Sequence, residues 1–300
     1  MIPTDVHVGR LHIGDWFNDV VTWIQDNLGP LVDVIMHVGT WLNDTLVDGF
    51  TWVPPLIMAI VLGLIGWAAS TWKLAIGAVI GMLVIQSMTN WGGSPQQYLW
   101  THAMQTLALV IISTVVALIL AIPLGILAAR SEPVGQVLRP VLDFMQTLPV
   151  FVYLVPAVMI FDIGVVPGIA ATVIFSMPPG VRLTQLGIRQ VDKEMVEAGR
   201  AFGSPSGKIL TGIQMPLAMP TIMAGVNQVI MLALSMVVVA GMVGAGGLGA
   251  DVYAGLTQFQ PQLAFESGLA VVILAMYLDR VTAGLGSRSA VARAEKATSR

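Results

Sequence analysis

The sequence predicts an all-α integral membrane protein, a polytopic bundle of about seven transmembrane helices preceded by amphipathic N-terminal helices. Hydrophobic residues make up 56% of the 300 residues and charged residues only 10%, a composition outside that of soluble domains. The charges are also segregated, because none occurs between Lys73 and Arg130 or between Lys208 and Asp251. Each gap is long enough for a helix that crosses the roughly 30 Å hydrocarbon core.

Residues 1–51 form an acidic leader that contains no membrane-length apolar run. Its only basic residue is Arg10, and its seven acidic residues are Asp5, Asp15, Asp19, Asp26, Asp33, Asp44 and Asp48. Apolar residues recur at steps of three and four, which predicts a pair of amphipathic helices. These helices either lie in the outer membrane interface or pack on the transmembrane bundle, and both interpretations stay open.

A transmembrane domain is predicted over residues 52–280, followed by a basic tail at 281–300. Its seven spanning segments cover about 52–70, 72–89, 98–129, 138–161, 165–186, 216–243 and 263–280. Pro123 can kink the third segment, and Pro178-Pro179 is expected to break the fifth. The tail is small, polar and basic, so we expect it to be disordered.

The distribution of basic residues predicts the orientation in the membrane. With the leader outside, thirteen of the fourteen Lys and Arg residues lie in or next to cytoplasmic connections, and Arg10 alone is outside. We therefore expect the N-terminus outside and the C-terminus in the cytoplasm.

One cytoplasmic connection, residues 187–215, has the signals of two helices joined at a corner. Asp192 can cap the first helix, and Gly203 suits the left-handed position just after its end. Ser204 is then expected to cap a second helix, with Pro205 at its first position. The first helix carries an apolar ridge made of Val191, Met195, Ala198 and Phe202. This ridge fits a groove of a partner protein, although an ordinary connector packed under the bundle gives the same pattern.

The spacing of this segment is more specific than its periodicity. Glu197-Ala198-Gly199 is followed after three residues by Gly203, and Ile213 and Met215-Pro216 come later. This resembles the cytoplasmic loop signature of ATP-binding-cassette importer permeases, E-A-A-x3-G-x9-I-x-L-P. Gly199 replaces the second alanine, which is a small change, and Met215 replaces the leucine, which nearly conserves volume.

The resemblance extends over roughly residues 98–285, which look like the glycine betaine, proline and choline branch of these permeases. It implies a type I importer fold and a permease for glycine betaine or a related compatible solute, such as proline, choline or carnitine. The implied partners are a second copy of the chain, two cytoplasmic ATPase subunits, an extracytoplasmic substrate-binding protein and membrane lipid. The implied location is the bacterial cytoplasmic (inner) membrane.

The same resemblance makes Glu197 to Gly203 a coupling helix that sits in a groove of the ATPase, with Ile213 and Pro216 completing the loop signature. The chain has no G-x-x-x-x-G-K-[ST] loop, so we expect ATP and Mg²⁺ to be bound by the partner and this chain not to be an enzyme. An ion-coupled secondary transporter and a non-transporting membrane scaffold are the alternatives. No nucleic-acid partner is expected.

Aromatic faces and polar oxygens attract a quaternary ammonium group. Residues of these types that could line a translocation path are Phe144, Phe151, Tyr153, Phe175, Ser176, Asn227 and Ser235. Each is also explained by helix packing. Asp143 lies just inside the fourth segment, where we expect it to pair with Arg139 one turn earlier.

Gly244, Gly246, Gly247 and Gly249 satisfy G-x-G-x-x-G, but an apolar membrane run precedes them rather than a strand of a nucleotide-binding unit. We expect a flexible outer turn that belongs to an external gate. The chain has no cysteine, and its four histidines, among them His102, lack metal-ligand spacing. We therefore expect no metal site.

Overall fold

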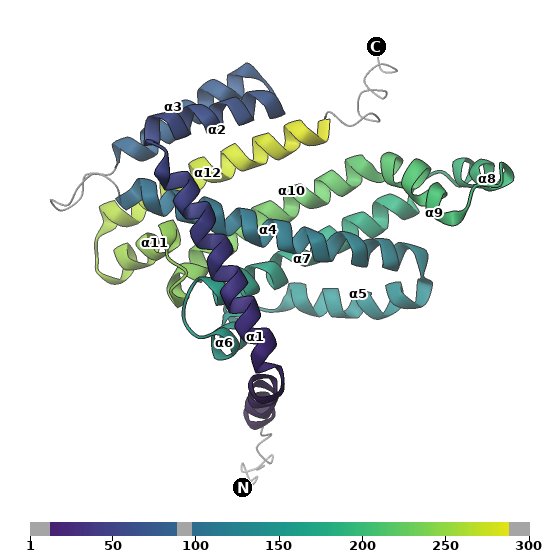
Figure 1. Cartoon of the computed structure of the whole chain (residues 1–300), viewed down its shortest axis with the longest axis horizontal. Helices are drawn as coiled ribbons and strands as arrows, with labels where there is room; N and C mark the ends of the chain where they lie inside the picture. The colour runs from purple at the N-terminus through teal and green to yellow at the C-terminus, as the bar shows by residue number, and fades with distance from the viewer. Residues whose placement is uncertain (1–12, 89–97, 288–300) are drawn as a thin grey trace, which may run out of the picture.

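Three long helices form the centre of the molecule. The computed structural model describes residues 13–88 and 98–287, and these ranges contain helices and turns but no β-strand. Helices α4 (Tyr98–Arg130), α7 (Val165–Arg189) and α10 (Met215–Ala240) pack side by side (Figure 1). The all-α prediction is confirmed for these ranges.

The number of predicted spans is approximate. Within the described residues, four helices are long and apolar enough to cross a membrane: Leu99–Arg130, Val165–Arg189, Ser206–Val243 and Pro261–Gly286. Two bent helix pairs raise the number to six if each pair is one span. The first two predicted segments correspond to α2 (Pro55–Ala69) and α3 (Trp72–Ser87). These have 15 and 16 residues and are therefore only about 22–24 Å long.

The fourth predicted segment, residues 138–161, is not one helix. It is divided between α5 (Glu132–Thr147) and α6 (Val150–Phe161), which meet at an angle of 100°. The break falls at Leu148 and Pro149 because proline lacks a backbone N–H and disfavours helical backbone in the residue before it.

Pro178-Pro179 were expected to break the fifth predicted segment, but α7 continues through both prolines. Both prolines are buried, and the next residue, Gly180, fits tightly against two helices. A Cβ on Gly180 would lie 2.9 Å from the Cβ of Ala121 in α4 and 3.1 Å from Val229 in α10. This close packing on both sides keeps α7 continuous across the lost backbone hydrogen bonds.

The leader forms one helix, α1 (Ile13–Trp52), rather than the predicted pair, and it contains Pro30. It runs across α4, α6 and α7 and bends by 108° into α2 (Figure 1). Val21 and Val32 are buried, whereas Trp16 is 78% exposed. Helix α1 thus packs on the bundle and also keeps apolar side chains on its outer face.

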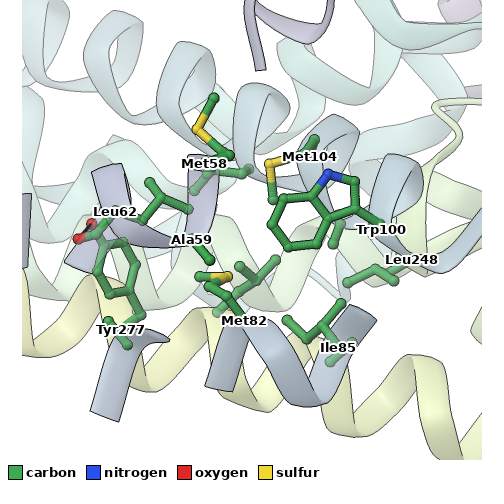
Figure 2. Packing of buried hydrophobic residues seen from close by; sticks show 14 of the residues in the cluster. Met58, Ala59, Leu62, Met82, Ile85, Trp100, Met104, Leu248 and Tyr277 are labelled. Carbon is green, nitrogen blue, oxygen red and sulfur yellow. Dashed lines mark hydrogen bonds between the residues drawn. The ribbon is translucent and has the colours of Figure 1, made fainter. Parts of the chain in front are cut away.

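A hydrophobic cluster joins the outlying helices to the centre. It includes side chains from α2, α3, α4, α11 (Gly247–Thr257) and α12 (Pro261–Ser287). Figure 2 shows its members Met58, Ala59, Leu62, Met82, Ile85, Trp100, Met104, Leu248 and Tyr277. The Tyr277 hydroxyl also donates a hydrogen bond of 2.9 Å to the Leu62 carbonyl, so α12 holds the α2–α3 hairpin through both apolar and polar contacts.

The sequence did not predict α11, and it placed the end of the last helix too early. Helix α12 continues to Ser287, so the first residues of the predicted tail are helical. Residues 288–300, to which the rest of the expected disordered tail belongs, lie outside the described residues.

Candidate functional site

The cytoplasmic connection predicted from the sequence begins with α8 (Lys193–Ala201). The side-chain Oδ1 of Asp192 accepts a hydrogen bond of 2.9 Å from the backbone N–H of Glu194. This confirms Asp192 as the cap, which satisfies one of the N–H groups that a helix start leaves without a partner.

Helix α8 ends at the predicted glycine. Gly203 has a φ of 73°, the left-handed conformation that glycine adopts without steric strain. Its N–H donates to the Arg200 carbonyl at 2.9 Å, and the N–H of Ser204 donates to Gly199 at 3.1 Å. The chain therefore reverses at a corner that also pairs the last carbonyls of the helix.

The second helix differs from the prediction. Helix α9 (Ser206–Ile209) has Pro205 as its N-cap residue, so the predicted capping role of Ser204 is wrong. It continues through a π-helical turn, Leu210–Gln214, into α10. The segment after the corner is thus the start of one long element rather than a separate short helix.

Residues of the loop signature form the contact between α8 and this π-helical turn. Gly199 is buried, and a Cβ added to it would lie 2.8 Å from Cδ1 of Ile213. Only a very small residue fits there without displacing Ile213. Glu197 lines a cavity beneath α8, and Pro216 is exposed in the first turn of α10.

Most of the predicted apolar ridge is exposed. Phe202 is 89% exposed and Met195 is 50% exposed, and Ala198 between them is also exposed. Val191 is instead half-buried and packs on a small cluster of apolar residues at the ends of α7 and α10. Helix α8 therefore presents Met195, Ala198 and Phe202 to its surroundings at one end of the bundle (Figure 1).

Basic side chains anchor this end of the bundle. A cavity of about 500 Å³ lies among the ends of α4, α7 and α8, and Arg130, Arg189, Lys193, Arg200 and Glu197 line it together with apolar residues. The Nη2 of Arg130 donates to Ser206 Oγ at 3.3 Å, and the Nη2 of Arg189 donates to the carbonyl of Ala128 at 2.8 Å. These bonds tie the corner and α7 to the end of α4.

Asp143 pairs across helices rather than along its own. Its carboxylate accepts a hydrogen bond from Arg182 of α7, so the predicted pairing with Arg139 is wrong. The two side chains are 57% and 38% exposed, respectively. The contact joins α5 to α7, and residues so distant in sequence give no periodic signal.

The residues predicted to line a path lie in different surroundings. Phe144 and Phe151 are 63% and 56% exposed. Tyr153 is buried against Phe175, with ring centroids 5.7 Å apart in an edge-to-face arrangement, and its hydroxyl donates to the Met145 carbonyl. Ser176 is fully buried in α7. A role of these side chains in a path stays a prediction.

Asn227 belongs to a polar cluster between α10 and α12. Its Nδ2 donates to Asp279 at 3.0 Å, and its Oδ1 accepts from Thr282 at 2.9 Å. Asp279 was not among the predicted site residues, although an ionisable residue inside a predicted span is the signal that points to it. Ser235 bonds within α10 to the Met231 carbonyl at 3.0 Å.

The glycine-rich turn lies at the end of the bundle away from α8 (Figure 1). Gly244, Gly246 and Gly247 have φ values of 82°, 74° and 67°, which explains why glycine occupies them. A Cβ on Gly249 would clash with the Val237 carbonyl. The turn therefore has a defined conformation that leads into α11, and its role as an outer gate stays a prediction.

Residues 13–88 and 98–287 contain no group of three or more His, Cys, Asp or Glu side chains placed to hold a metal ion.

Comparison with known proteins identifies the relatives of the chain. Residues 121–288 match the family described as binding-protein-dependent transport system inner membrane component. The chain is 42% identical to the glycine betaine transport system permease protein OpuAB of Bacillus subtilis, over 91% of this chain and 94% of that protein. It is 40% identical to the glycine betaine/proline betaine permease protein ProW of Escherichia coli, over 94% of this chain and 77% of that protein.

A third relative and a solved structure agree with these matches. The glycine betaine/carnitine transport permease protein GbuB of Listeria monocytogenes is 46% identical over 81% of this chain and 86% of that protein. A chain of the MetNI methionine ABC transporter in an inward facing conformation has a TM-score of 0.56 at 20% identity, covering 66% of this chain and 95% of that chain. At this identity the likeness shows a shared fold.

Proposed function

This chain belongs to the family of binding-protein-dependent transport system inner membrane components, and we propose that it is the permease of an ATP-driven importer of glycine betaine or a related compatible solute. The substrate is supported by the names of OpuAB, ProW and GbuB, each of which includes glycine betaine. Proline, choline and carnitine are the related solutes to compare.

The energy of ATP hydrolysis reaches the permease through α8, on which the ATPase docks. The observation that carries this proposal is the exposed apolar ridge of Met195, Ala198 and Phe202 on a helix whose other exposed residues are mostly charged. Such a ridge buries apolar area when it enters a groove of another protein. The partner is a cytoplasmic ATPase subunit, which binds ATP and Mg²⁺ itself.

The contacts of α8 supply a route from the ATPase to the transmembrane helices. Gly199 packs on Ile213, which lies in the π-helical turn that continues into α10. On the other side, the N-terminal turn of α9 is bonded to Arg130 at the end of α4. Displacement of α8 would therefore act on α10 and α4 and change the arrangement of the bundle between its inward-open and outward-open forms.

The complete importer contains two copies of this chain, two ATPase subunits and one extracytoplasmic substrate-binding protein that delivers the solute. The segregation of basic residues supports an N-terminus outside and a C-terminus in the cytoplasm. In this orientation the leader and the glycine-rich turn face the binding protein, and α8 faces the ATPase.

Uptake into proteoliposomes tests the class of transporter. The complete complex is reconstituted with its ATPase and binding protein, and uptake of radiolabelled glycine betaine, choline, carnitine and proline is measured. We expect ATP inside the vesicles to drive uptake and an imposed proton or sodium gradient without ATP to drive none. Uptake driven by the ion gradient alone would favour a secondary transporter, and no uptake of any solute would favour a scaffold.

A further inference from the structure

Helix α11 is attached to α4 by three side chains on one face of α4. Gln105 and Thr106 lie three and four residues after His102, so all three lie on one face of the helix. All three contact the start of α11. The Oε1 of Gln105 accepts from the N–H of Gly247 at 3.1 Å, and Thr106 Oγ1 accepts from the N–H of Leu248 at 2.9 Å.

The third contact joins two ionisable side chains. The Nδ1 of His102 and the Oδ2 of Asp251 lie 2.6 Å apart, and the two side chains are only 25% and 15% exposed. Asp251 is one turn after Gly247, so the three contacts hold the first turn of α11 along its length. A partly buried hydrogen bond between such groups is stronger than one on the surface.

Apolar packing supports the same attachment. Leu248 is fully buried and belongs to the cluster that contains Trp100 and Met104 of α4, and Figure 2 shows it beside Trp100. A Cβ on Gly247 would lie 2.6 Å from Thr106 Oγ1 and 3.3 Å from the His102 carbonyl oxygen, so the backbone of α11 approaches α4 closely. The first N–H groups of α11, which a helix start leaves without partners in the helix itself, are thus satisfied by α4.

We propose that α11 and the adjoining part of α4 form one rigid unit, and that the glycine-rich turn moves with α4 during transport instead of opening as an independent gate. His102 and Asp251 are the positioning residues of this unit. The proposal rests on the proposed transport function. It differs from the predicted flexible gate, because the turn is held by α11, which follows it, and by α4, which it contacts.

The absence of cysteine from the sequence allows a direct test. In the complete reconstituted complex, the double variant His102→Cys and Asp251→Cys is linked by a short, reducible bismethanethiosulfonate reagent. We expect the linked protein to take up glycine betaine with ATP at least as fast as the reduced double variant, because the link replaces the lost contact between His102 and Asp251. Loss of uptake on linking, restored by reduction, would overturn the proposal. Each single cysteine variant treated with the same reagent is the control for the modification itself.

A distance measurement keeps the test independent of substrate uptake. Spin labels are placed at two exposed positions, Val115 of α4, nine residues after Thr106, and Leu256 of α11, in complexes diluted with unlabelled chain. We expect the same distance distribution by pulsed electron resonance with and without ATP. A shift on ATP addition would overturn the rigid unit even if the complex transported no betaine, whereas an absent uptake with constant distances would count against the transport function alone.

A conservative variant tests whether His102 positions α11. His102→Ala removes the contact with Asp251, whereas His102→Asn places an amide N–H near the position of Nδ1. We expect slower ATP-driven uptake for the alanine variant and recovery for the asparagine variant at equal amounts of folded complex. Equal uptake for all three proteins would show that the contact does not position the turn.

Discussion

The side chain of Ile213 packs directly on the backbone of Gly199, so that a Cβ on Gly199 would be 2.8 Å from Cδ1 of Ile213. This contact joins α8 to the π-helical turn that becomes α10. The loop signature therefore has a physical basis: small residues let α8 approach the turn closely. In the proposed mechanism, a force on α8 would pass to α10 through this contact.

The size of residue 199 should determine whether the contact survives. Gly199→Ala should be tolerated because the atom that its Cβ meets is Cδ1, the flexible end of Ile213, which can rotate away. Gly199→Leu should displace α8 and uncouple ATP hydrolysis from uptake, because its side chain has no space there. Both rates are measured in proteoliposomes, and full coupling in the leucine variant would contradict the account.

The corner at Gly203 requires a left-handed backbone, so Gly203→Val should distort the end of α8. The strain of such a conformation is roughly 1–2 kcal/mol for a residue with a Cβ, and more for a β-branched one. We expect ATP hydrolysis to continue without coupled uptake. Gly207→Val is the matched control, since Gly207 has helical backbone and no atom within 4 Å of an added Cβ. Equal effects of the two valines would refute the role of the corner.

The ion pair of Asp143 should couple to Arg182 and not to Arg139. Because both side chains are substantially exposed, we expect an interaction energy below about 1 kcal/mol. Double-mutant cycles of Asp143→Asn with Arg182→Gln and with Arg139→Gln, measured by thermal unfolding in detergent, separate the two pairings. A larger coupling to Arg139 would show that the pairing along the helix is the one that forms.

Asn227 should act on stability through α12. Asn227→Val removes its bonds to Asp279 and Thr282 and should destabilise the protein by about 1 kcal/mol per bond. Ser235→Ala is the control on the same helix, because the Ser235 hydroxyl bonds within α10. If Asn227→Val instead raises the KM for betaine and leaves thermal stability unchanged, Asn227 contacts the solute rather than α12.

Features set by short stretches of sequence were predictable. Asp192 and Gly203 act on backbone groups within a few residues of themselves, so their roles as cap and corner could be inferred before the structure. The exposure of Phe202 was not decided by the sequence, because the same apolar ridge could have packed under the bundle. The apolar composition also predicted the all-α membrane fold.

Features set by distant residues were not predictable. Pro149 ends a helix whereas Pro178-Pro179 does not, and the difference lies in the packing of Gly180 between α4 and α10. A single segment, 138–161, was predicted across the right-angled junction of α5 and α6, because apolar residues continue on both sides of Leu148 and Pro149. Asp143 with Arg182, and His102 with Asp251, are joined only when helices far apart in sequence meet.

The central claim is that the exposed ridge of α8 docks on an ATPase and thereby drives uptake, and a charge placed on that ridge tests it most directly. Phe202→Asp is compared with Phe259→Asp, because these phenylalanines are 89% and 90% exposed. Phe202 directly follows α8 and Phe259 comes shortly after α11, and these two helices lie at opposite ends of the bundle (Figure 1). We expect Phe202→Asp to lose co-purification with the ATPase and ATP-driven betaine uptake, and Phe259→Asp to retain the co-purified ATPase. Normal association and uptake in Phe202→Asp would contradict the account.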